Sequence, residues 1–86
     1  MIHTIIKYTN SAFKHGFFEE DIKKSFLNVI YDDILNEYEN KHLLIGFNGK
    51  GILLEIMYNV IDNETIRVFH AMECRKSFIT LFDSLV

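Results

Sequence analysis

The chain has little of what stabilises or anchors proteins outside a reducing compartment. Only one of its 86 residues is cysteine, so no intramolecular disulfide can form, and such cysteine usage is typical of the cytoplasm. No apolar run approaches the roughly 20 residues that span a bilayer. The amino terminus also lacks a basic region followed by a long apolar core, so it does not resemble a signal peptide. We therefore expect a cytoplasmic protein that does not enter the membrane.

Positive charge is also scarce. The chain carries 9 Lys and Arg residues against 12 Asp and Glu residues, which gives a net charge of −3. Nucleic-acid-binding domains usually present a basic face, because releasing the counterions of phosphate supplies much of their affinity. The acidic total argues against such a domain but leaves room for a local basic patch. Proline is absent as well, so the turns must be built from residues such as Gly and Asn.

Apolar and aromatic residues are plentiful. Hydrophobic residues make up 49% of the chain and aromatic residues 14%, which is enough to fill a small core without a disulfide. A chain of this length buries about 60% of its unfolded surface. We therefore expect one domain, residues 1–86, with a modest core.

The amino-terminal half is expected to contain one strand and two helices. Residues 2–7 are rich in β-branched side chains and favour a strand. The polar run 9–11 offers caps for a short helix that ends at Gly16. A second helix starts at the acidic run 19–21, whose charge suits the positive end of the helix dipole. Its apolar stripe recurs at helical spacing, at Phe18, Ile22, Phe26 and Val29.

The carboxy-terminal half is expected to contain strands and a final helix. Alternating apolar residues predict strands at 42–47, 52–60 and 65–70, and the short linkers between them favour an antiparallel meander. Residues 31–38 fit either a further strand or an extended loop. The tail 73–85 predicts a helix with one apolar stripe, Phe78, Leu81, Phe82 and Leu85. The expected fold class is α+β, with two amino-terminal helices on an antiparallel sheet and a helix at the carboxy end.

Residue types that bind phosphate and transfer protons gather between positions 67 and 76. Cleaving RNA without a metal ion needs a base for the 2′-hydroxyl, an acid for the leaving 5′-oxygen, and cations for the charged transition state. His70 suits either proton role near neutral pH. Arg67, Arg75 and Lys76 suit phosphate, which arginine binds through two parallel donors. Strand alternation places Arg67 and His70 on opposite faces, which counts against their acting together.

Each candidate also has a structural explanation. His70 can be a packed histidine at a strand end. Lys14 and His15, next to Gly16, fit either the capping of helix carbonyls or the rim of an RNA groove. Glu55, on a half-apolar strand face, needs a cationic partner, and Arg67 on a neighbouring strand is the obvious one. Such a pair is either a structural ion pair or a base held beside its phosphate ligand.

No cofactor or metal is expected. Cys74 fits a small core hydrophobe, because nothing in the sequence places a base beside it or lowers its pKa. Zinc sites need closely spaced ligand pairs. That spacing is missing among the candidate ligands His3, His15, His42, His70 and Cys74.

The order of several short motifs resembles the BrnT family, small toxins of bacterial type II toxin–antitoxin systems. The similarity runs from about Tyr8 to Phe82 and rests on order and spacing. Where many members have Ser-Ala-Arg after the last strand, this chain has His-Ala-Met, so that arginine is missing at Met72. The matching motifs are Lys14-His15-Gly16, an acidic helix start, Leu43–Phe47, Gly51–Ile56, and Arg67–Met72 followed by Arg75.

The resemblance implies a RelE-like fold and a ribonuclease that arrests growth. It also implies neutralisation by a DNA-binding antitoxin encoded beside it, and it leaves open a dimer or a heterotetramer with that antitoxin. The residue types are compatible with catalysis by His70, Glu55 and His15, and with RNA binding by Arg67, Arg75, Lys14 and Lys76. The alternative is a non-catalytic module that binds the antitoxin and acts in co-repression. The acidic total and the missing arginine at Met72 favour that alternative.

Overall fold

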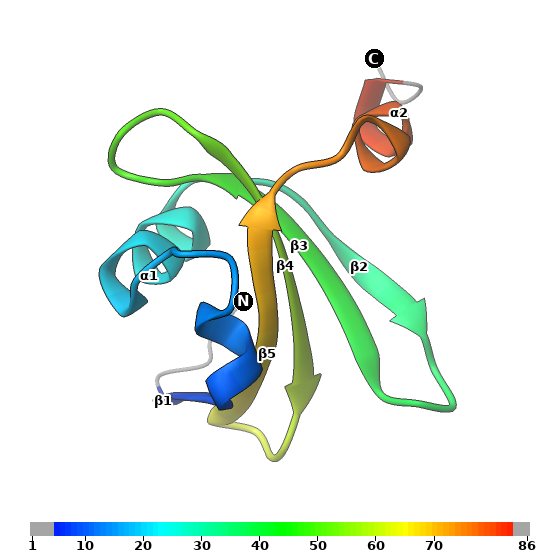
Figure 1. Ribbon diagram of the computed structural model, residues 1–86. Helices are drawn as coiled ribbons and strands as arrows, with labels where there is room; N and C mark the ends of the chain where they lie inside the picture. Colours follow the sequence, from blue (N-terminus) through cyan, green and yellow to red (C-terminus); the bar gives the residue numbers. More distant parts are fainter. Residues whose placement is uncertain (1–4, 84–86) are drawn as a thin grey trace.

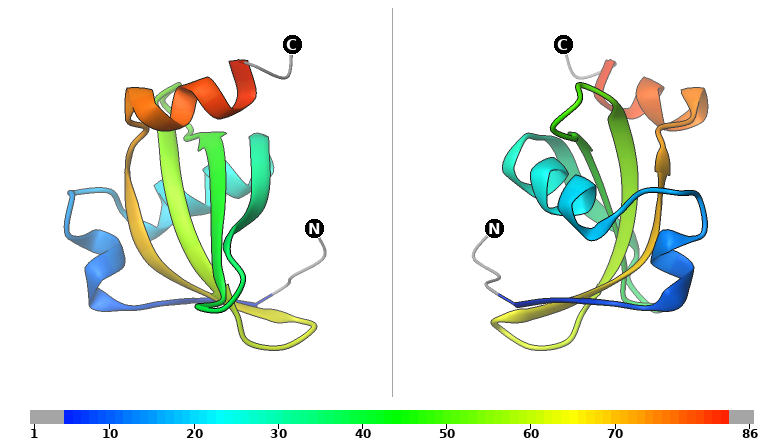
Figure 2. Two further views of the ribbon diagram at one scale, coloured as in Figure 1. Left: turned by 90° about the vertical axis from the view of Figure 1, so that its right-hand side faces the viewer. Right: turned by 60° about the vertical axis from the view of Figure 1, so that its left-hand side comes forward.

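A five-stranded mixed sheet organises the chain, and the computed structural model describes residues 5–83 of it (Figure 1). The strands lie in the order β1-β5-β4-β3-β2. One α-helix lies on each side of the sheet (Figure 2). The elements are β1 (Ile5–Tyr8), the 3-10 turn η1 (Asn10–Phe13), α1 (Glu19–Leu27), β2 (Val29–Asn36), β3 (Lys41–Phe47), β4 (Leu53–Val60), β5 (Thr65–Glu73) and α2 (Lys76–Asp83).

The expected fold class is wrong in its helices and in its sheet. The amino-terminal half contains a single α-helix, α1, because the first expected helix is only the four-residue 3-10 turn η1. A polar start at 9–11 and Gly16 leave too little chain between them to offset the cost of nucleating an α-helix. β1 pairs with β5 in parallel, so the sheet is not wholly antiparallel. The RelE-like architecture is therefore overturned, because the five-stranded mixed sheet carries only one amino-terminal α-helix and a short carboxy-terminal one.

Strands β2 to β5 follow one another as antiparallel neighbours. The ambiguous segment 31–38 belongs largely to β2, which begins at Val29. Val29 therefore starts a strand and does not continue the apolar stripe of α1. Asn28 ends the helix, and its side chain donates hydrogen bonds to the backbone oxygens of Lys24, at 2.9 Å, and Phe47, at 3.4 Å.

The main core lies between α1 with η1 and one face of the sheet. Its buried side chains are mainly apolar, and Ser25 of α1 is a buried polar exception. Helix α1 comes close to β3 at Gly46, where a Cβ atom would collide with the backbone oxygens of Ser25 and Asn28. Glycine is therefore required there for the helix to seat on the sheet. The core consists of Ala12, Ile22, Leu44, Leu54, Ile56, Tyr58, Ile66, Val68 and Ala71.

Strand β5 is longer, and helix α2 shorter, than the sequence pattern predicts. β5 continues through Glu73 because Met72 and Glu73 pair with Glu55 and Leu54 of β4. Helix α2 begins only at Lys76 and lies beyond the end of β5, on the side of the sheet away from α1 (Figure 2). Ile2, Leu85 and the side chain of Phe82, on which the expected strand and helix partly relied, lie outside the described residues.

Within residues 5–83, neither helix has the length and hydrophobicity needed to cross a membrane.

Candidate functional site

A buried carboxylate lies at the centre of the face away from α1. Glu55 of β4 has no exposed surface, and its neighbours across the ladder are Ile45 of β3 and Met72 of β5. Removing a carboxylate from water among such neighbours is costly unless it is paired and hydrogen-bonded. The contacts of Glu55 therefore decide what this face can do.

Arg75 satisfies most of this carboxylate. Its backbone N–H donates to Oε1 of Glu55 at 2.9 Å. Its guanidinium donates from Nε to Oε1 at 3.0 Å and to Oε2 at 3.2 Å, and from Nη2 to Oε2 at 2.7 Å. The guanidinium also lies over the ring of Phe78 in α2, 5.1 Å from its centroid. Because the Arg75 side chain is 50% exposed, one edge of the guanidinium faces solvent while the other is held by Glu55.

His70 reaches the same carboxylate because of a β-bulge. Met57 pairs with His70, but Tyr58 pairs with Val68, so Phe69 is an extra residue in β5. Such an insertion reverses the alternation of side chains along the bulged strand. The ring Nε2 of His70 then lies 3.0 Å from Oε2 of Glu55. His70 does not share the face of Ile66 and Val68, as strict alternation predicts.

The segment after β1 brings a second histidine to this place. The hydroxyl of Ser11 in η1 donates a 2.7 Å hydrogen bond to the backbone oxygen of Phe69, the bulged residue. This bond ties η1 to the free edge of β5 at the bulge. The chain then turns at Gly16, which has a φ of 88°. The ring of His15 meets the ring of His70 edge-on, with centroids 5.6 Å apart. We call His15, Glu55, His70 and Arg75 together the Glu55 cluster.

Electrostatics keep Glu55 ionised in spite of its burial. Burial is the largest single effect and favours the neutral acid. The hydrogen bonds from the guanidinium and backbone of Arg75 and from His70 outweigh it together, so the pKa of Glu55 falls below its ordinary value. The Glu55 carboxylate in turn raises the pKa of Arg75 by its hydrogen bonds and its charge. The pair is therefore an ion pair, with a negative charge beside His70.

Arg67 does not join the Glu55 cluster. The expected pair of Glu55 with Arg67 is wrong, because Arg67 pairs with Asn59 across the ladder and donates to its side-chain oxygen at 3.2 Å. Asn59 is four residues from Glu55 along β4, which is about 13 Å at the rise of a strand. The bulge does place Arg67 and His70 on one face, contrary to the expectation. They remain separated along β5.

Lys14 and Lys76, the two lysines predicted to bind RNA, are both exposed, and each is next in sequence to a member of the Glu55 cluster. Lys14 directly precedes His15, and Lys76 directly follows Arg75 at the start of α2. Cys74 is half-buried, and its backbone N–H donates to Leu53 at 2.8 Å. Burial, followed by the charge of Glu55, raises the pKa of the Cys74 thiol, which disfavours the nucleophilic thiolate. Within 5–83, no three His, Cys, Asp or Glu side chains are arranged to hold a metal ion.

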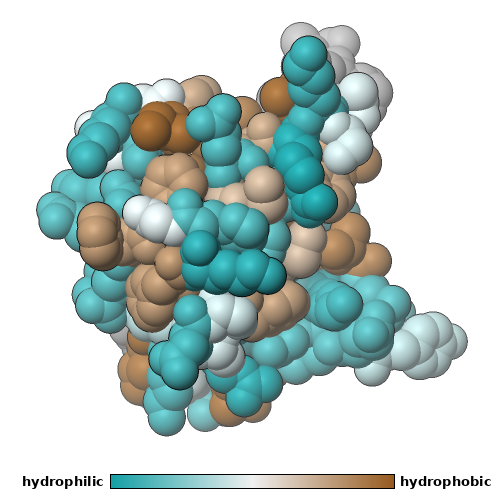
Figure 3. Space-filling view, viewed as in Figure 1, coloured by the Kyte–Doolittle hydropathy of each residue, from teal (hydrophilic) through white to brown (hydrophobic). Residues whose placement is uncertain are grey.

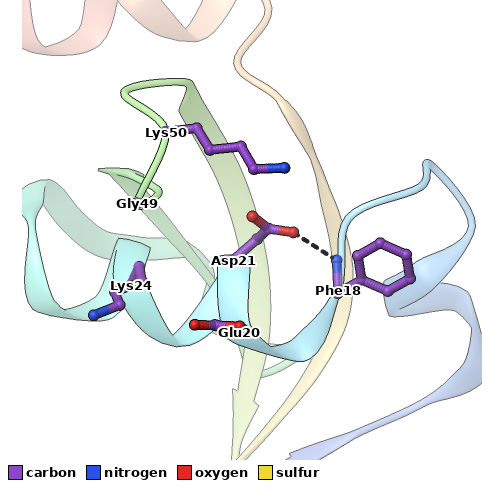
Figure 4. A pocket seen from close by; sticks show the side chains of 6 residues that line it. All are labelled: Phe18, Glu20, Asp21, Lys24, Gly49 and Lys50. Atoms are coloured by element: carbon purple, nitrogen blue, oxygen red, sulfur yellow. Dashed lines mark hydrogen bonds between the residues drawn. The ribbon is translucent and has the colours of Figure 1, made fainter.

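A separate pocket of about 340 Å³ lies at the start of α1, away from the Glu55 cluster. Asp21 points into it, and its carboxylate accepts a hydrogen bond from the backbone N–H of Phe18 at 2.9 Å (Figure 4). The other carboxylate oxygen accepts a hydrogen bond from the side chain of Asn48 at 3.3 Å. These bonds cap the helix and hold the turn between β3 and β4. The pocket is lined by both acidic and basic residues. The lining residues are Phe18, Glu20, Asp21, Lys24, Gly49 and Lys50.

Two contributors to the site were not expected from the sequence. Ser11 was considered only as a helix cap, yet it fixes the bulge that turns His70 toward Glu55. Phe78 was assigned to an apolar stripe, yet its ring carries the guanidinium of Arg75. The Ser11 bond spans 58 residues and therefore has no local signal. Arg75 and Phe78 are only three residues apart, so helical spacing at the start of α2 could have indicated their contact.

Comparison of the chain with protein-family models, with curated proteins and with solved structures finds no match.

Proposed function

We propose that this protein is an endoribonuclease that cleaves RNA without a metal ion and acts as the toxin of a bacterial toxin–antitoxin pair. The observation that carries the proposal is the approach of two histidine rings, His15 and His70, beside Arg75. Two imidazoles and a guanidinium are the groups that this cleavage requires: a base, an acid and a phosphate ligand. The toxin role rests on the resemblance to the BrnT family alone.

The proposed roles follow from the surroundings of each ring. The Nε2 atom of His70 lies 3.0 Å from Oε2 of the buried Glu55 carboxylate, so Glu55 orients this ring as a carboxylate orients the histidine base of a catalytic triad. His70 is therefore the base for the 2′-hydroxyl. His15 is exposed and is the acid for the leaving 5′-oxygen. Glu55 is a positioning residue, since it holds His70 and Arg75 and has no surface of its own.

The reaction is a transesterification within the RNA. The 2′-oxygen forms a bond to phosphorus while the bond from phosphorus to the 5′-oxygen breaks. His70 accepts the proton of the 2′-hydroxyl, and His15 donates one to the 5′-oxygen. The products are a 2′,3′-cyclic phosphate and a 5′-hydroxyl. The N–H groups of Arg75 that do not bond Glu55 bind the phosphate, and Lys14 and Lys76 extend the positive surface along the RNA.

A second candidate is a non-catalytic module that binds a DNA-binding antitoxin and acts in co-repression. The observation in its favour is the saturation of Glu55, because a carboxylate with this many hydrogen bonds neutralises the charge of Arg75. The pair of Glu55 and Arg75 is then a structural ion pair, which does not require a catalytic role. Both candidates place the protein in the bacterial cytoplasm with an antitoxin as its partner.

Induced expression in a bacterial host separates the two candidates. The nuclease arrests growth and degrades RNA, and both effects are lost in His70→Ala. His42→Ala is the matched control, since His42 stacks on Tyr58, 4.9 Å between centroids, outside the Glu55 cluster. If His70→Ala still arrests growth, the Glu55 cluster is not the source of the growth arrest. A wild-type protein that neither arrests growth nor degrades RNA, but binds the product of a neighbouring gene, would favour the module.

A further inference from the structure

Strand β2 leaves one long edge of the sheet without a partner. It is last in the strand order, and its outer edge meets no other strand within 5–83 (Figure 1). An unpaired edge presents backbone N–H and C=O groups that another chain can use. β2 has eight residues, twice the length of β1 at the opposite edge. The edge is therefore long enough to accept a further strand.

The side chains of β2 are unusually apolar for an open edge. Val29, Ile30, Ile34 and Leu35 are 42–52% exposed. Open edges are usually protected by short length or by charged side chains. Covering four half-exposed aliphatic side chains removes apolar surface from water, which favours association. The exposed apolar surface along β2 therefore favours a covering chain.

The charge around β2 restricts what that chain can be. Residues 29–41 contain four acidic residues and one lysine, a net charge of −3. The lysine, Lys41, lies 3.7 Å from the carboxylate of Glu39. The protruding end of the β2–β3 hairpin has a largely hydrophilic surface (Figure 3). The acidic residues are Asp32, Asp33, Glu37 and Glu39.

This charge argues against a second copy of the chain. β-bulges interrupt β2 between Val29 and Tyr31 and between Ile34 and Asn36, so its regular part is 31–34. A symmetric antiparallel pairing of two copies centred there brings two Asp32 or two Asp33 side chains opposite each other. Like charges directly opposite are destabilising, whereas opposite charges stabilise a strand pair.

A local hydrogen bond links the charge to the backbone edge. The backbone N–H of Ile34 donates to Oδ1 of its neighbour Asp33 at 2.8 Å. While this bond is made, the N–H is occupied by the chain itself. A lysine or arginine that binds the Asp33 carboxylate frees the N–H for a carbonyl oxygen of the incoming strand. A basic strand can therefore release the Ile34 N–H for pairing, whereas an uncharged strand leaves it bonded to Asp33.

We propose that β2 binds an extended basic segment of another protein, in which Lys or Arg alternates with apolar residues, as a sixth strand of the sheet. The segment's backbone pairs with β2, its cations face Asp33 on one face of the sheet, and its apolar side chains cover Ile34 on the opposite face. This proposal does not depend on RNA cleavage, because β2 contains no member of the Glu55 cluster.

The test uses the isotopically labelled full chain and three synthetic peptides of the length of β2. The first alternates lysine with valine, the second alternates glutamate with valine, and the third is the first with a central proline. Only the lysine–valine peptide is expected to shift the backbone amide signals of 29–36, Ile34 included. The glutamate peptide carries negative charge, which Asp33 repels. The proline peptide lacks one backbone N–H that the strand pairing needs.

A variant pair tests the charge. Asp33→Asn with Glu37→Gln is expected to weaken binding of the lysine–valine peptide by about threefold per charge at low salt. The asparagine keeps an acceptor for Ile34. The matched control, Glu19→Gln with Glu20→Gln on α1, is expected to bind like the wild type. Four results would overturn the proposal: no shift on β2, shifts centred elsewhere, equal binding of the glutamate peptide, or dimerisation of the free chain through β2 in sedimentation.

Discussion

The carboxylate of Glu55 accepts both the backbone N–H and the guanidinium of Arg75, at 2.9 Å and 2.7 Å in the shortest contacts. These hydrogen bonds connect strand β4 to the segment between the end of β5 and the start of α2. The two partners differ sharply in exposure, because Glu55 is fully buried and the Arg75 side chain is half exposed. This asymmetry makes the consequences of removing either partner unequal.

Arg75→Ala is expected to destabilise the protein more than Glu55→Gln. Without the Arg75 guanidinium the buried carboxylate keeps only His70 and the backbone N–H of residue 75, and leaving a buried charge without its partner costs about 3–5 kcal/mol. In Glu55→Gln the half-exposed guanidinium is solvated instead, so the loss is smaller. Chemical denaturation monitored by circular dichroism measures both. Arg67→Ala, which removes an exposed cation bonded to Asn59, is the control and should change the free energy of unfolding by about 0.5 kcal/mol or less. A larger loss in Glu55→Gln would contradict the asymmetry.

Acid should weaken the fold through Glu55. Its pKa in the folded protein lies below the ordinary value of 4.5, because the bonds from Arg75 and His70 together exceed the effect of burial. The stabilisation is therefore complete above pH 4.5 and is lost as pH falls through the lowered pKa. The free energy of unfolding should fall more steeply below pH 4.5 in the wild type than in Glu55→Gln. Parallel profiles for the two proteins would show that Glu55 is not the group responsible.

Tyr58 should resist ionisation in alkali. Burial, followed by the hydrogen bond and charge of Asp32, raises its pKa above the ordinary value of 10.0, and its hydroxyl donates to Asp32 at 2.6 Å. Burial and the charge of Glu19 also raise the pKa of Tyr8 to about 12. A raised pKa stabilises the fold below pH 10 and ceases to do so as pH rises beyond it. In an absorbance titration, Tyr58→Phe should remove one of the tyrosines that ionise at the high-pH end of the curve. If Tyr58→Phe instead removes a tyrosine that ionises near the ordinary pKa, Tyr58 is not one of the groups with a raised pKa.

Gly46→Ala should loosen the seat of α1 on the sheet. The added methyl group meets backbone oxygens of Ser25 and Asn28, which cannot rotate away, and overpacking of this kind costs roughly 1–3 kcal/mol. Gly49→Ala is the control, because its new Cβ would lie 3.6 Å from the flexible side chain of Lys24. Thermal unfolding compares the two variants. Equal midpoints would indicate that α1 does not approach β3 as closely as described.

The sequence pattern locates single elements better than their assembly. Strands β3 and β4 lie close to their expected ranges because alternation along Leu54, Ile56 and Tyr58 records a buried face directly. Residues 71–73, by contrast, are also compatible with a helix start. They extend β5 because β4 offers them ladder partners, and such pairing overrides local propensity.

The Glu55 cluster could be predicted in its residue types but not in its contacts. Glu55, His70, Arg75 and His15 were all candidates, yet Glu55 was paired with Arg67. The bulge at Phe69 has no local signal in the sequence, and it decides which face His70 occupies. The bond from Ser11 that holds this bulge spans 58 residues. Contacts of this kind depend on the completed sheet and not on the pattern around either residue.

The most direct test of the central claim is cleavage of a short RNA by the purified protein, followed by analysis of the ends. The wild type should cleave in the presence of a metal chelator and leave a 2′,3′-cyclic phosphate, and an RNA with 2′-deoxyribose at the cleaved position should stay intact. His15→Ala and His70→Ala should each slow cleavage by about 10²–10⁴-fold, with His42→Ala close to the wild type. The account would be contradicted by no cleavage, by cleavage of the deoxy substrate, or by undiminished cleavage in His15→Ala and His70→Ala.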